Sequence, residues 1–193
     1  MITMRVAVAR AISIVGHPVA VVFAAVLVAA STRGASRGQL WFVGGAWAAF
    51  GFVVLGFSWL QVRSGHWSHI DASARTERAS LNVFLGVMCF LAAVLAWFAT
   101  HRPYMSIGLG LSGTLALGAL VIGRWVKMSL HVAFAAFATA LVWPNKLAAV
   151  AGVLVTLALI WSRLTLGRHV AADVTTGLLL GAIAGGVCHL WVV

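Results

Sequence analysis

A short polar pattern interrupts the apolar C-terminal part of the chain. Ser162 and Arg163 are followed, after five residues, by His169 and, after three more, by Asp173. A helix after Gly167 would place His169 and Asp173 on one face, where the carboxylate can accept a hydrogen bond from one ring nitrogen. Arg163 precedes the turn expected at Gly167, and its planar guanidinium suits a tetrahedral anion such as phosphate. The pattern predicts an active site with an oriented imidazole facing a phosphate.

The composition places this pattern in a membrane protein. Of the 193 residues, 63% are hydrophobic and 8% are charged, and the mean hydropathy is +1.06. No polar stretch is long enough for a separate soluble domain, so we predict one integral-membrane domain over residues 1–193. Its net charge of +10 is expected to meet anionic membrane lipids rather than nucleic acid. Ionisable groups are costly in this setting and point to function.

Seven apolar segments predict an all-α, polytopic transmembrane bundle of about six or seven spans. They cover residues 10–31, 40–62, 81–100, 105–123, 129–143, 147–163 and 170–192. Most approach the ~20 residues needed to cross a bilayer, and the fifth and sixth are shorter. The stretch at 143–146 separates these two because proline cannot continue a helix. We expect the first segment to be a retained helix, and Gly181 and Gly185 to allow close helix packing.

Alternation of the seven segments gathers the polar residues on one membrane face. The connections at 63–80, 124–128 and 163–169 fall on this face, and those at 32–39, 101–104 and 143–146 fall on the other. The first face collects Arg63, His66, His69, Asp71, Arg75, Glu77, Arg78, Arg124, Lys127, Ser129, His131, Arg163, Arg168, His169 and Asp173. We predict a basic, histidine-rich pocket for an anionic head group whose tails remain in lipid.

A second cluster begins the fifth apolar segment. Ser129 and its backbone amide would lie where the helix dipole favours an anion. His131 would reach the same volume and could donate a proton to a leaving oxygen. A helical histidine is more often a packing residue, but the shared face with His169 favours the catalytic interpretation. Lys127 and Arg124 could add phosphate-binding charge.

The polar loop at 63–80 allows two interpretations. Asp71, Arg75 and Arg78 would share one face of a helical turn, where Asp71 could hold an arginine. Arg75 and Arg78 then either bind the substrate phosphate or meet the phosphates of surrounding lipids, with Trp67 as an anchor at the head groups.

The pattern ending in Asp173 resembles a known family signature. Ser162-Arg163-x5-His169-x3-Asp173 is similar to the third signature of the type 2 phosphatidic acid phosphatase superfamily, and the resemblance covers roughly residues 60–190. It implies that His169 attacks phosphorus and becomes a phosphohistidine, that Asp173 orients it, and that Arg163 binds phosphate oxygens. It also implies that no metal is required.

The triplet Ser129-Leu130-His131 resembles the second signature of the same family, usually Pro-Ser-Gly-His. The resemblance implies that His131 protonates the leaving alkoxide and that Ser129 binds a phosphate oxygen. Met128 and Leu130 stand where proline and glycine are common.

The first signature of the family, a lysine six residues before Arg-Pro, is not present in its usual form. Arg102 and Pro103 form the only Arg-Pro pair, and Leu95 stands in the place of the lysine. By its position in the chain, the loop carrying Arg75 and Arg78 resembles a variant that replaces this first signature.

These observations predict a lipid phosphate phosphatase that acts on a polyprenyl or glycerolipid phosphate or diphosphate without a cofactor. A lipid phosphotransferase using the same phosphohistidine and a non-enzymatic anionic-lipid transporter remain alternatives. A metal site formed by His66, His69 and Asp71 is disfavoured, because it lacks a well-defined set of three or four donors. The residues do not select an oligomeric state.

The distribution of basic residues gives an expected orientation in a bacterial inner membrane. When the residues assigned to phosphate are set aside, Arg5 and Arg10 remain on the site face. The opposite face holds Arg33, Arg37, Arg102 and Lys146. Because cytoplasmic loops are enriched in Lys and Arg, we expect the site to face away from the cytoplasm.

Overall fold

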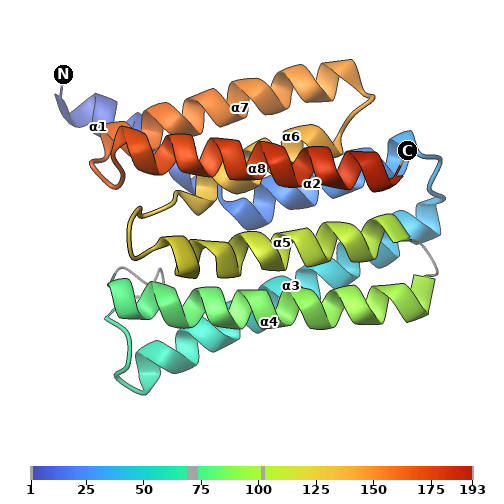
Figure 1. The fold of residues 1–193 in the computed structure, drawn as a ribbon, viewed down its shortest axis with the longest axis horizontal. Coiled ribbons are helices and arrows are strands. Elements are labelled where there is room, and N and C mark those ends of the chain that lie inside the picture. The colour runs from blue at the N-terminus through green and yellow to red at the C-terminus, as the bar shows by residue number, and fades with distance from the viewer. Residues whose placement is uncertain (1, 69–73, 101–102, 193) are drawn as a thin grey trace. The chain divides into compact units, whose positions relative to one another are not determined.

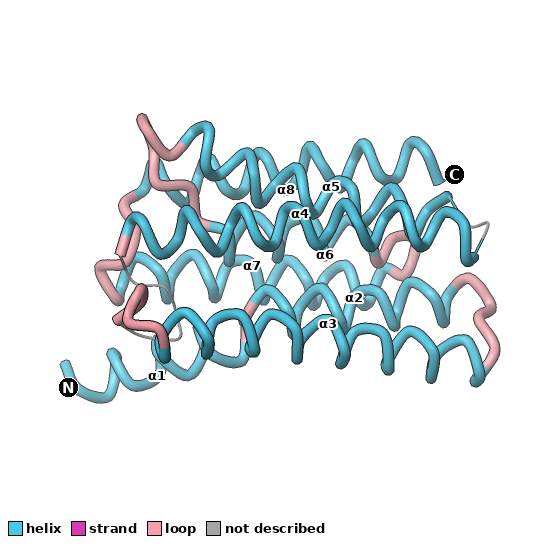
Figure 2. The backbone as a smooth tube through the Cα atoms, turned by 90° about the horizontal axis from the view of Figure 1, so that it is seen from below, coloured by secondary structure: helices cyan, strands magenta, loops and turns pink. Residues whose placement is uncertain are grey.

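The protein is all-helical over the residues that the structure describes. We analysed a computed structural model in which residues 2–68, 74–100 and 103–192 are described. These residues form eight helices and no strand (Figures 1 and 2). The helices are α1 (Ile2–Val15), α2 (Pro18–Thr32), α3 (Arg37–Arg63), α4 (Arg75–Thr100), α5 (Pro103–Ile122), α6 (Leu130–Leu141), α7 (Lys146–Thr165) and α8 (Ala171–Val192). The predicted fold class is confirmed.

Five of the described helices are long and apolar enough to cross a membrane, namely α3, α4, α5, α7 and α8. The pair α1 and α2 would make a sixth span. The span predicted at 129–143 is wrong, because α6 has only 12 residues and a length of roughly 18 Å. A hydrocarbon core is about 30 Å thick. The protein is therefore an integral membrane protein with five or six spanning elements among its described residues.

The first apolar segment is a broken helix rather than the single helix expected at 10–31. Helix α1 ends at Val15, and α2 starts at Pro18 at an angle of 51° to it. Proline is accepted in the first turn of a helix because its missing N–H has no intrahelical partner there, and His17 caps this turn. The break follows from the Gly16-His17-Pro18 sequence.

The chain divides into two compact units, residues 1–36 with 122–193 and residues 37–121. In the first unit, α6 is central and packs against α8, α7 and α2, while α1 packs against α7. One side of α6 is almost entirely buried, including Val132, Ala133 and Phe137. The short helix therefore forms the core of the unit that carries both sequence motifs.

Glycines on α8 allow its backbone to lie against α6. A Cβ atom at Gly177 would be 2.6 Å from the carbonyl oxygen of Ser129, and one at Gly181 would overlap the carbonyl of Ala133. Gly185 faces Ala140 in the same way. The predicted close approach at Gly181 and Gly185 is confirmed, and it brings the first turn of α8 beside the start of α6.

The second unit contains α3, α4 and α5. Phe57 of α3 stacks on Phe84 of α4 with ring centroids 3.9 Å apart. Trp67 packs edge-on against Phe57 and is 5% exposed. The interpretation of Trp67 as a head-group anchor is therefore wrong, because its ring is part of the core of this unit.

Candidate active site

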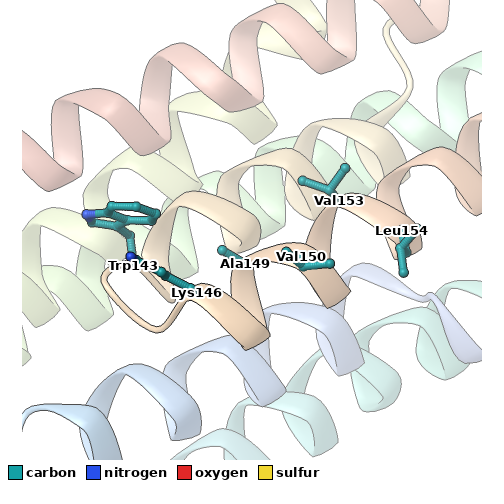
Figure 3. Close-up of a pocket in the computed structure, with 6 residues that line it drawn as sticks. All are labelled: Trp143, Lys146, Ala149, Val150, Val153 and Leu154. Carbon is teal, nitrogen blue, oxygen red and sulfur yellow. The ribbon is translucent and has the colours of Figure 1, made fainter.

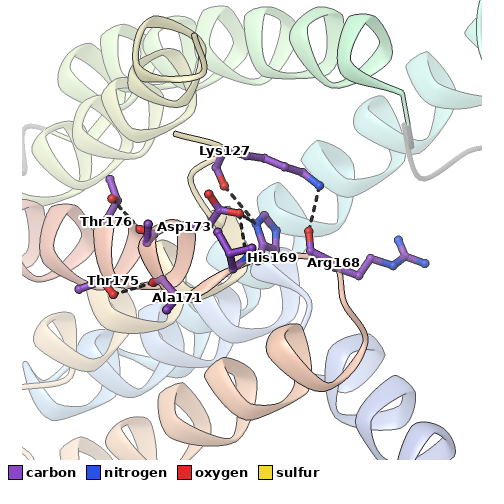
Figure 4. A network of polar contacts seen from close by, with 9 residues as sticks. Lys127, Arg168, His169, Ala171, Asp173, Thr175 and Thr176 are labelled. Atoms are coloured by element: carbon purple, nitrogen blue, oxygen red, sulfur yellow. Dashed lines mark hydrogen bonds and ion pairs between the residues drawn. The ribbon is translucent and has the colours of Figure 1, made fainter. Parts of the chain in front are cut away.

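Two connections of the first unit meet at one end. The Lys127 ammonium donates a hydrogen bond to the Arg168 carbonyl at 2.9 Å (Figure 4). The Ser129 amide donates to the Asp173 carbonyl at 3.1 Å. At the other end, Arg33 donates to the Trp143 carbonyl at 3.5 Å. The predicted common face of 124–128 and 163–169 is confirmed within this unit. The loop at 63–80 belongs to the second unit.

Gly167 ends α7 and reverses the chain toward the site. It has a φ of +62°, a conformation that glycine adopts without a Cβ clash. Its amide donates to the Leu164 carbonyl at 3.1 Å, and the Arg168 amide donates to the Arg163 carbonyl at 3.2 Å. These two bonds form a Schellman motif. The predicted turn at Gly167 is confirmed, and it sets the relation between Arg163 and His169.

Asp173 orients His169 from the first turn of α8. Its Oδ2 lies 3.2 Å from His169 Nδ1 and accepts the Val170 amide at 3.1 Å. His169 Nδ1 is also 3.1 Å from the Lys127 carbonyl oxygen. His169 precedes α8, so the expectation that both residues lie within one helix is wrong. The contact forms instead because the carboxylate reaches back over the helix start, as in a capping box.

The surroundings of His169 keep its ring neutral. Burial lowers the pKa of His169 from 6.5 to about 4, and the positive charges of Arg163 and Lys127 act in the same direction. The hydrogen bond and the charge of Asp173 oppose this shift. Because Nδ1 faces two oxygen acceptors, the proton of the neutral ring lies on Nδ1 and the lone pair on Nε2. This is the form of imidazole that can attack phosphorus.

Ser129 is the N-cap of α6 and is completely buried. The predicted anion site at its backbone amide is wrong, because α8 packs closely here and the amide donates its hydrogen bond to the Asp173 carbonyl. Its Oγ has no hydrogen-bond partner among the described residues. A buried hydroxyl without a partner is uncommon and requires an explanation, and an oxygen of a bound anion would supply one.

Arg163 lies in the last turn of α7. Its charge acts on both His131 and His169, so the three side chains share one electrostatic neighbourhood. Its Nη1 donates to Ser13 Oγ at 2.9 Å, and its buried Nε has no partner among the described residues. Ser162 has a structural contact, because its Oγ donates to the Ala9 carbonyl at 2.6 Å.

The other predicted phosphate ligands of the first unit differ in their surroundings. Lys127 joins the two connections at the site and its charge acts on His169. Arg124 is exposed, and its guanidinium carbon lies 3.6 Å from the centroid of the Trp125 ring. Arg168, which lies beside His169 in the sequence, also acts electrostatically on His131.

Arg75 and Arg78 stand at the start of α4 in the second unit, so their phosphate-binding role stays a prediction. Glu77 between them is buried and accepts the amides of Ser68 at 2.7 Å and Ala74 at 2.8 Å. Glu77 thus connects Ser68 and Ala74, a role that sequence reasoning missed.

The remaining predictions for this loop concern His69 and Asp71, which lie outside the described residues. The same holds for Arg102. No three His, Cys, Asp or Glu residues in the described ranges are grouped as a metal site.

His17 is the site residue that sequence reasoning missed. Its ring packs edge-to-face on His131, with centroids 5.5 Å apart and an interplanar angle of 84°. The Arg163 charge acts on it as well. The sequence contained an indication of this role. A His-Pro pair inside an apolar segment is costly, and such a pair is expected where the histidine has a function.

A separate hollow of about 420 Å³ lies beside the start of α7 (Figure 3). It is lined by Trp143, Lys146, Ala149, Val150, Val153 and Leu154. Lys146 and Arg163 are 17 residues apart on α7, roughly 25 Å along the helix axis. The lining offers no acid, base or nucleophile pair, so we assign no chemistry to this hollow.

Comparisons with known proteins give no further identification. No family model, no curated protein and no solved structure matches the chain. The resemblance to the phosphatase superfamily therefore rests on the two sequence motifs alone.

Proposed function

We propose that the protein is a lipid phosphate phosphatase that works through a phosphohistidine intermediate. The observation that carries the proposal is the held imidazole of His169. Its Nδ1 faces Asp173 and the Lys127 carbonyl, which leaves the Nε2 lone pair for attack. Arg163, whose charge acts on the same ring, supplies a guanidinium for phosphate oxygens.

In the first step, Nε2 of His169 attacks the phosphorus of the bound ester. The bond between phosphorus and the leaving oxygen breaks, and the electron pair goes to that oxygen. The negative charge of the bound phosphate favours the protonated form of His131, which donates its proton to that oxygen, and the lipid product leaves. The phosphoryl group remains on His169, whose positive charge is balanced by Asp173.

In the second step, water attacks the same phosphorus. His131 now accepts a proton from the water, the bond between phosphorus and Nε2 breaks, and inorganic phosphate is released. The ring regains its lone pair on Nε2 while its Nδ1–H stays hydrogen-bonded to Asp173, so the cycle closes with one water consumed.

Fixed positive charge supports this reaction more than any single base does. Phosphoryl transfer spreads negative charge over three oxygens in the transition state. Arg163, Arg168 and Lys127 act electrostatically on one or both of the histidines, so a phosphate between these rings meets several cations. The Ser129 hydroxyl and Arg163 Nε, which have no hydrogen-bond partner in the described part of the chain, are donors suited to the same anion.

The apolar setting favours a membrane lipid as substrate. The site lies at one end of a unit whose helices α7 and α8 expose large apolar side chains. Lipid tails can therefore stay in the bilayer while the phosphate reaches the polar end. We include polyprenyl and glycerolipid phosphates or diphosphates in this class, and we place the site on the side of a bacterial inner membrane away from the cytoplasm.

The test is phosphate release by the protein purified in detergent, with a panel of lipid phosphates. We expect release without added divalent metal, inhibition by vanadate, and a loss on the order of a thousandfold or more in His169→Ala. His189→Ala is the matched control, because this histidine lies on the same helix as Asp173 near its opposite end. Activity that survives in His169→Ala, or that a chelator abolishes and a metal restores, would contradict the proposal.

Product analysis separates the alternatives. A hydrolase yields inorganic phosphate in proportion to dephosphorylated lipid, whereas a phosphotransferase moves the group to an added alcohol. A transporter releases no phosphate from any member of the panel.

A further inference from the structure

The break between α1 and α2 brings a third imidazole to the proposed site. His17 stands at this break and packs edge-to-face on His131, with ring centroids 5.5 Å apart. The break fits closely against α7, because a Cβ atom at Gly16 would lie 2.7 Å from Leu159 Cδ2. The position of His17 is thus determined by the packing of the helices that carry the second and third motifs.

The third motif itself holds α1 in this place. Ser162 donates to the Ala9 carbonyl at 2.6 Å in a fully buried contact, and Arg163 donates to Ser13 Oγ at 2.9 Å. Both acceptors lie on α1, one and two turns before His17. The residues that resemble a phosphate-binding motif therefore also fix the segment that presents His17.

The hydrogen bond made by His17 determines which ring nitrogen carries the proton. His17 Nδ1 accepts the Val19 amide at 3.3 Å and so caps α2. An accepting Nδ1 has no hydrogen, so the neutral ring carries its proton on Nε2. The side chain remains exposed. His17 thus offers an N–H donor beside His131, the reverse of His169, whose Nε2 carries a lone pair.

The location of this donor indicates what it binds. His131 faces the leaving oxygen in the proposed reaction, so its neighbour faces whatever the leaving oxygen is attached to. In a phosphomonoester that atom is carbon, which accepts no hydrogen bond. In a diphosphate ester it is a second phosphorus with anionic oxygens, which accept strongly.

We propose that His17 is a specificity-determining residue that makes the site prefer diphosphate esters of lipids over monophosphate esters. Its Nε2–H donates to an oxygen of the inner phosphate. This inference rests on the proposed phosphatase function. His169 attacks the outer phosphorus, the bond to the bridging oxygen breaks, and the lipid monophosphate leaves with the electron pair. His17 stabilises the negative charge that develops on this leaving group.

The test compares kcat/KM for farnesyl diphosphate and farnesyl monophosphate in three proteins. Asparagine at position 17 retains the helix cap but lacks a donor at the Nε2 position, whereas the amide of glutamine reaches near that position. We expect the wild type to prefer the diphosphate by about tenfold or more, the size expected for a hydrogen bond to a charged group. His17→Asn should lose about this factor on the diphosphate and much less on the monophosphate. His17→Gln should recover part of the preference.

Three results would overturn the inference. They are a wild type without preference for the diphosphate, a preference that survives in His17→Asn, and equal losses on both substrates, which would indicate a role confined to positioning His131. If His17→Asn does not fold, His17→Ser provides another capping residue without the donor. Absence of phosphate release by the wild type would reject the proposed function as well. An inactive His169→Ala beside an unaffected His17→Asn would reject the His17 role alone.

Discussion

Asp173 both stabilises the start of α8 and orients His169 in the proposed site. Its carboxylate caps the first turn of α8 through the Val170 amide and receives His169 Nδ1 on the same oxygen. Its carbonyl accepts the Ser129 amide and joins α8 to α6. The orientation of the proposed nucleophile, His169, therefore depends on the same residue that starts the helix. The same residue also connects it to α6, which carries the proposed general acid His131.

The neutrality of His169 is open to a direct test. Diethyl pyrocarbonate reacts with the neutral form of imidazole and not with the protonated form. Its addition at His169 can be followed by peptide mass spectrometry. With the pKa lowered from 6.5 to about 4, the ring stays neutral as the pH falls from 7.5 to about 5. The rate constant for modification of His169 should therefore stay constant over that range. N-acetylhistidine serves as the reference compound. Its rate constant should fall over the same pH range, because its imidazole becomes protonated.

Lys127→Gln sharpens this test, because it removes one of the positive charges that lower the pKa of His169. The pH at which reaction at His169 is half-maximal should move upward toward 6.5 in this variant. A half-maximal rate near pH 6.5 in the wild type would contradict the neutral, buried nucleophile.

The proposed role of His131 as proton donor predicts a dependence on the leaving group. An alkoxide needs a proton to leave, whereas p-nitrophenolate leaves without one. His131→Ala should therefore lower kcat/KM, which reports the first step alone, on the order of a thousandfold with an alkyl phosphate. The loss with p-nitrophenyl phosphate should be at least tenfold smaller, as measured in steady-state assays of both substrates. Equal losses would assign His131 to packing or binding instead.

At the scale of helices, the Schellman turn at Gly167 sets the path from Arg163 to His169. A residue with a Cβ atom at a φ of +62° costs about 1–2 kcal/mol, and asparagine tolerates this conformation better than alanine. Gly167→Ala should lower the unfolding temperature and kcat, while Gly167→Asn should stay closer to the wild type in both. Thermal unfolding in detergent and phosphate release check this order. The reverse order would show that the turn is not held as described.

The contact between α6 and α8 predicts a second pair of variants. A Cβ atom at Gly181 would overlap the Ala133 carbonyl, and backbone cannot move aside as a side chain can, so Gly181→Ala should cost about 1–3 kcal/mol. Gly186 on the same helix has nothing within 4 Å of an added Cβ. Gly186→Ala should therefore be neutral or slightly stabilising. Unfolding temperatures of the two variants measure the difference, and similar values would contradict the close packing.

The sequence indicated most of these elements, and the errors have physical reasons. Apolar length located the long helices, and the turn at Gly167 followed from glycine. Composition could not show that α6 is too short to span, because a buried core helix and a membrane helix have similar hydrophobicity. The break at His17 was missed because apolar residues continue on both sides of Gly16-His17-Pro18, so hydropathy alone joins the two helices into one segment.

The site was only partly accessible to sequence reasoning. Spacing of four residues predicted the contact between His169 and Asp173, which forms although only Asp173 lies in a helix. The Ser129 amide was wrongly assigned to an anion. Its hydrogen-bond acceptor is the carbonyl of Asp173, 44 positions later in the chain. The contact between His17 and His131 depends on tertiary packing of α1 and α2, which no local pattern contains.

At the scale of the molecule, the first unit has two different ends. One end holds the two histidines, Asp173 and Lys127, and the other holds the contact between Arg33 and the Trp143 carbonyl, close to Lys146. Arg33 and Lys146 take no part in the proposed chemistry, so their charge can serve orientation. Because Lys and Arg accumulate in cytoplasmic loops, this end should face the cytoplasm and the site should face the opposite side.

Cysteine labelling tests this orientation in intact cells. Cys89 and Cys188 are both buried, so a membrane-impermeant maleimide should report mainly on an added cysteine. Val170→Cys at the site end is exposed and should react from outside, whereas Ser36→Cys near the opposite end should react only after the membrane is disrupted. The reversed pattern would place the site on the cytoplasmic side, and the proposed phosphatase would then draw its lipid substrate from the inner leaflet.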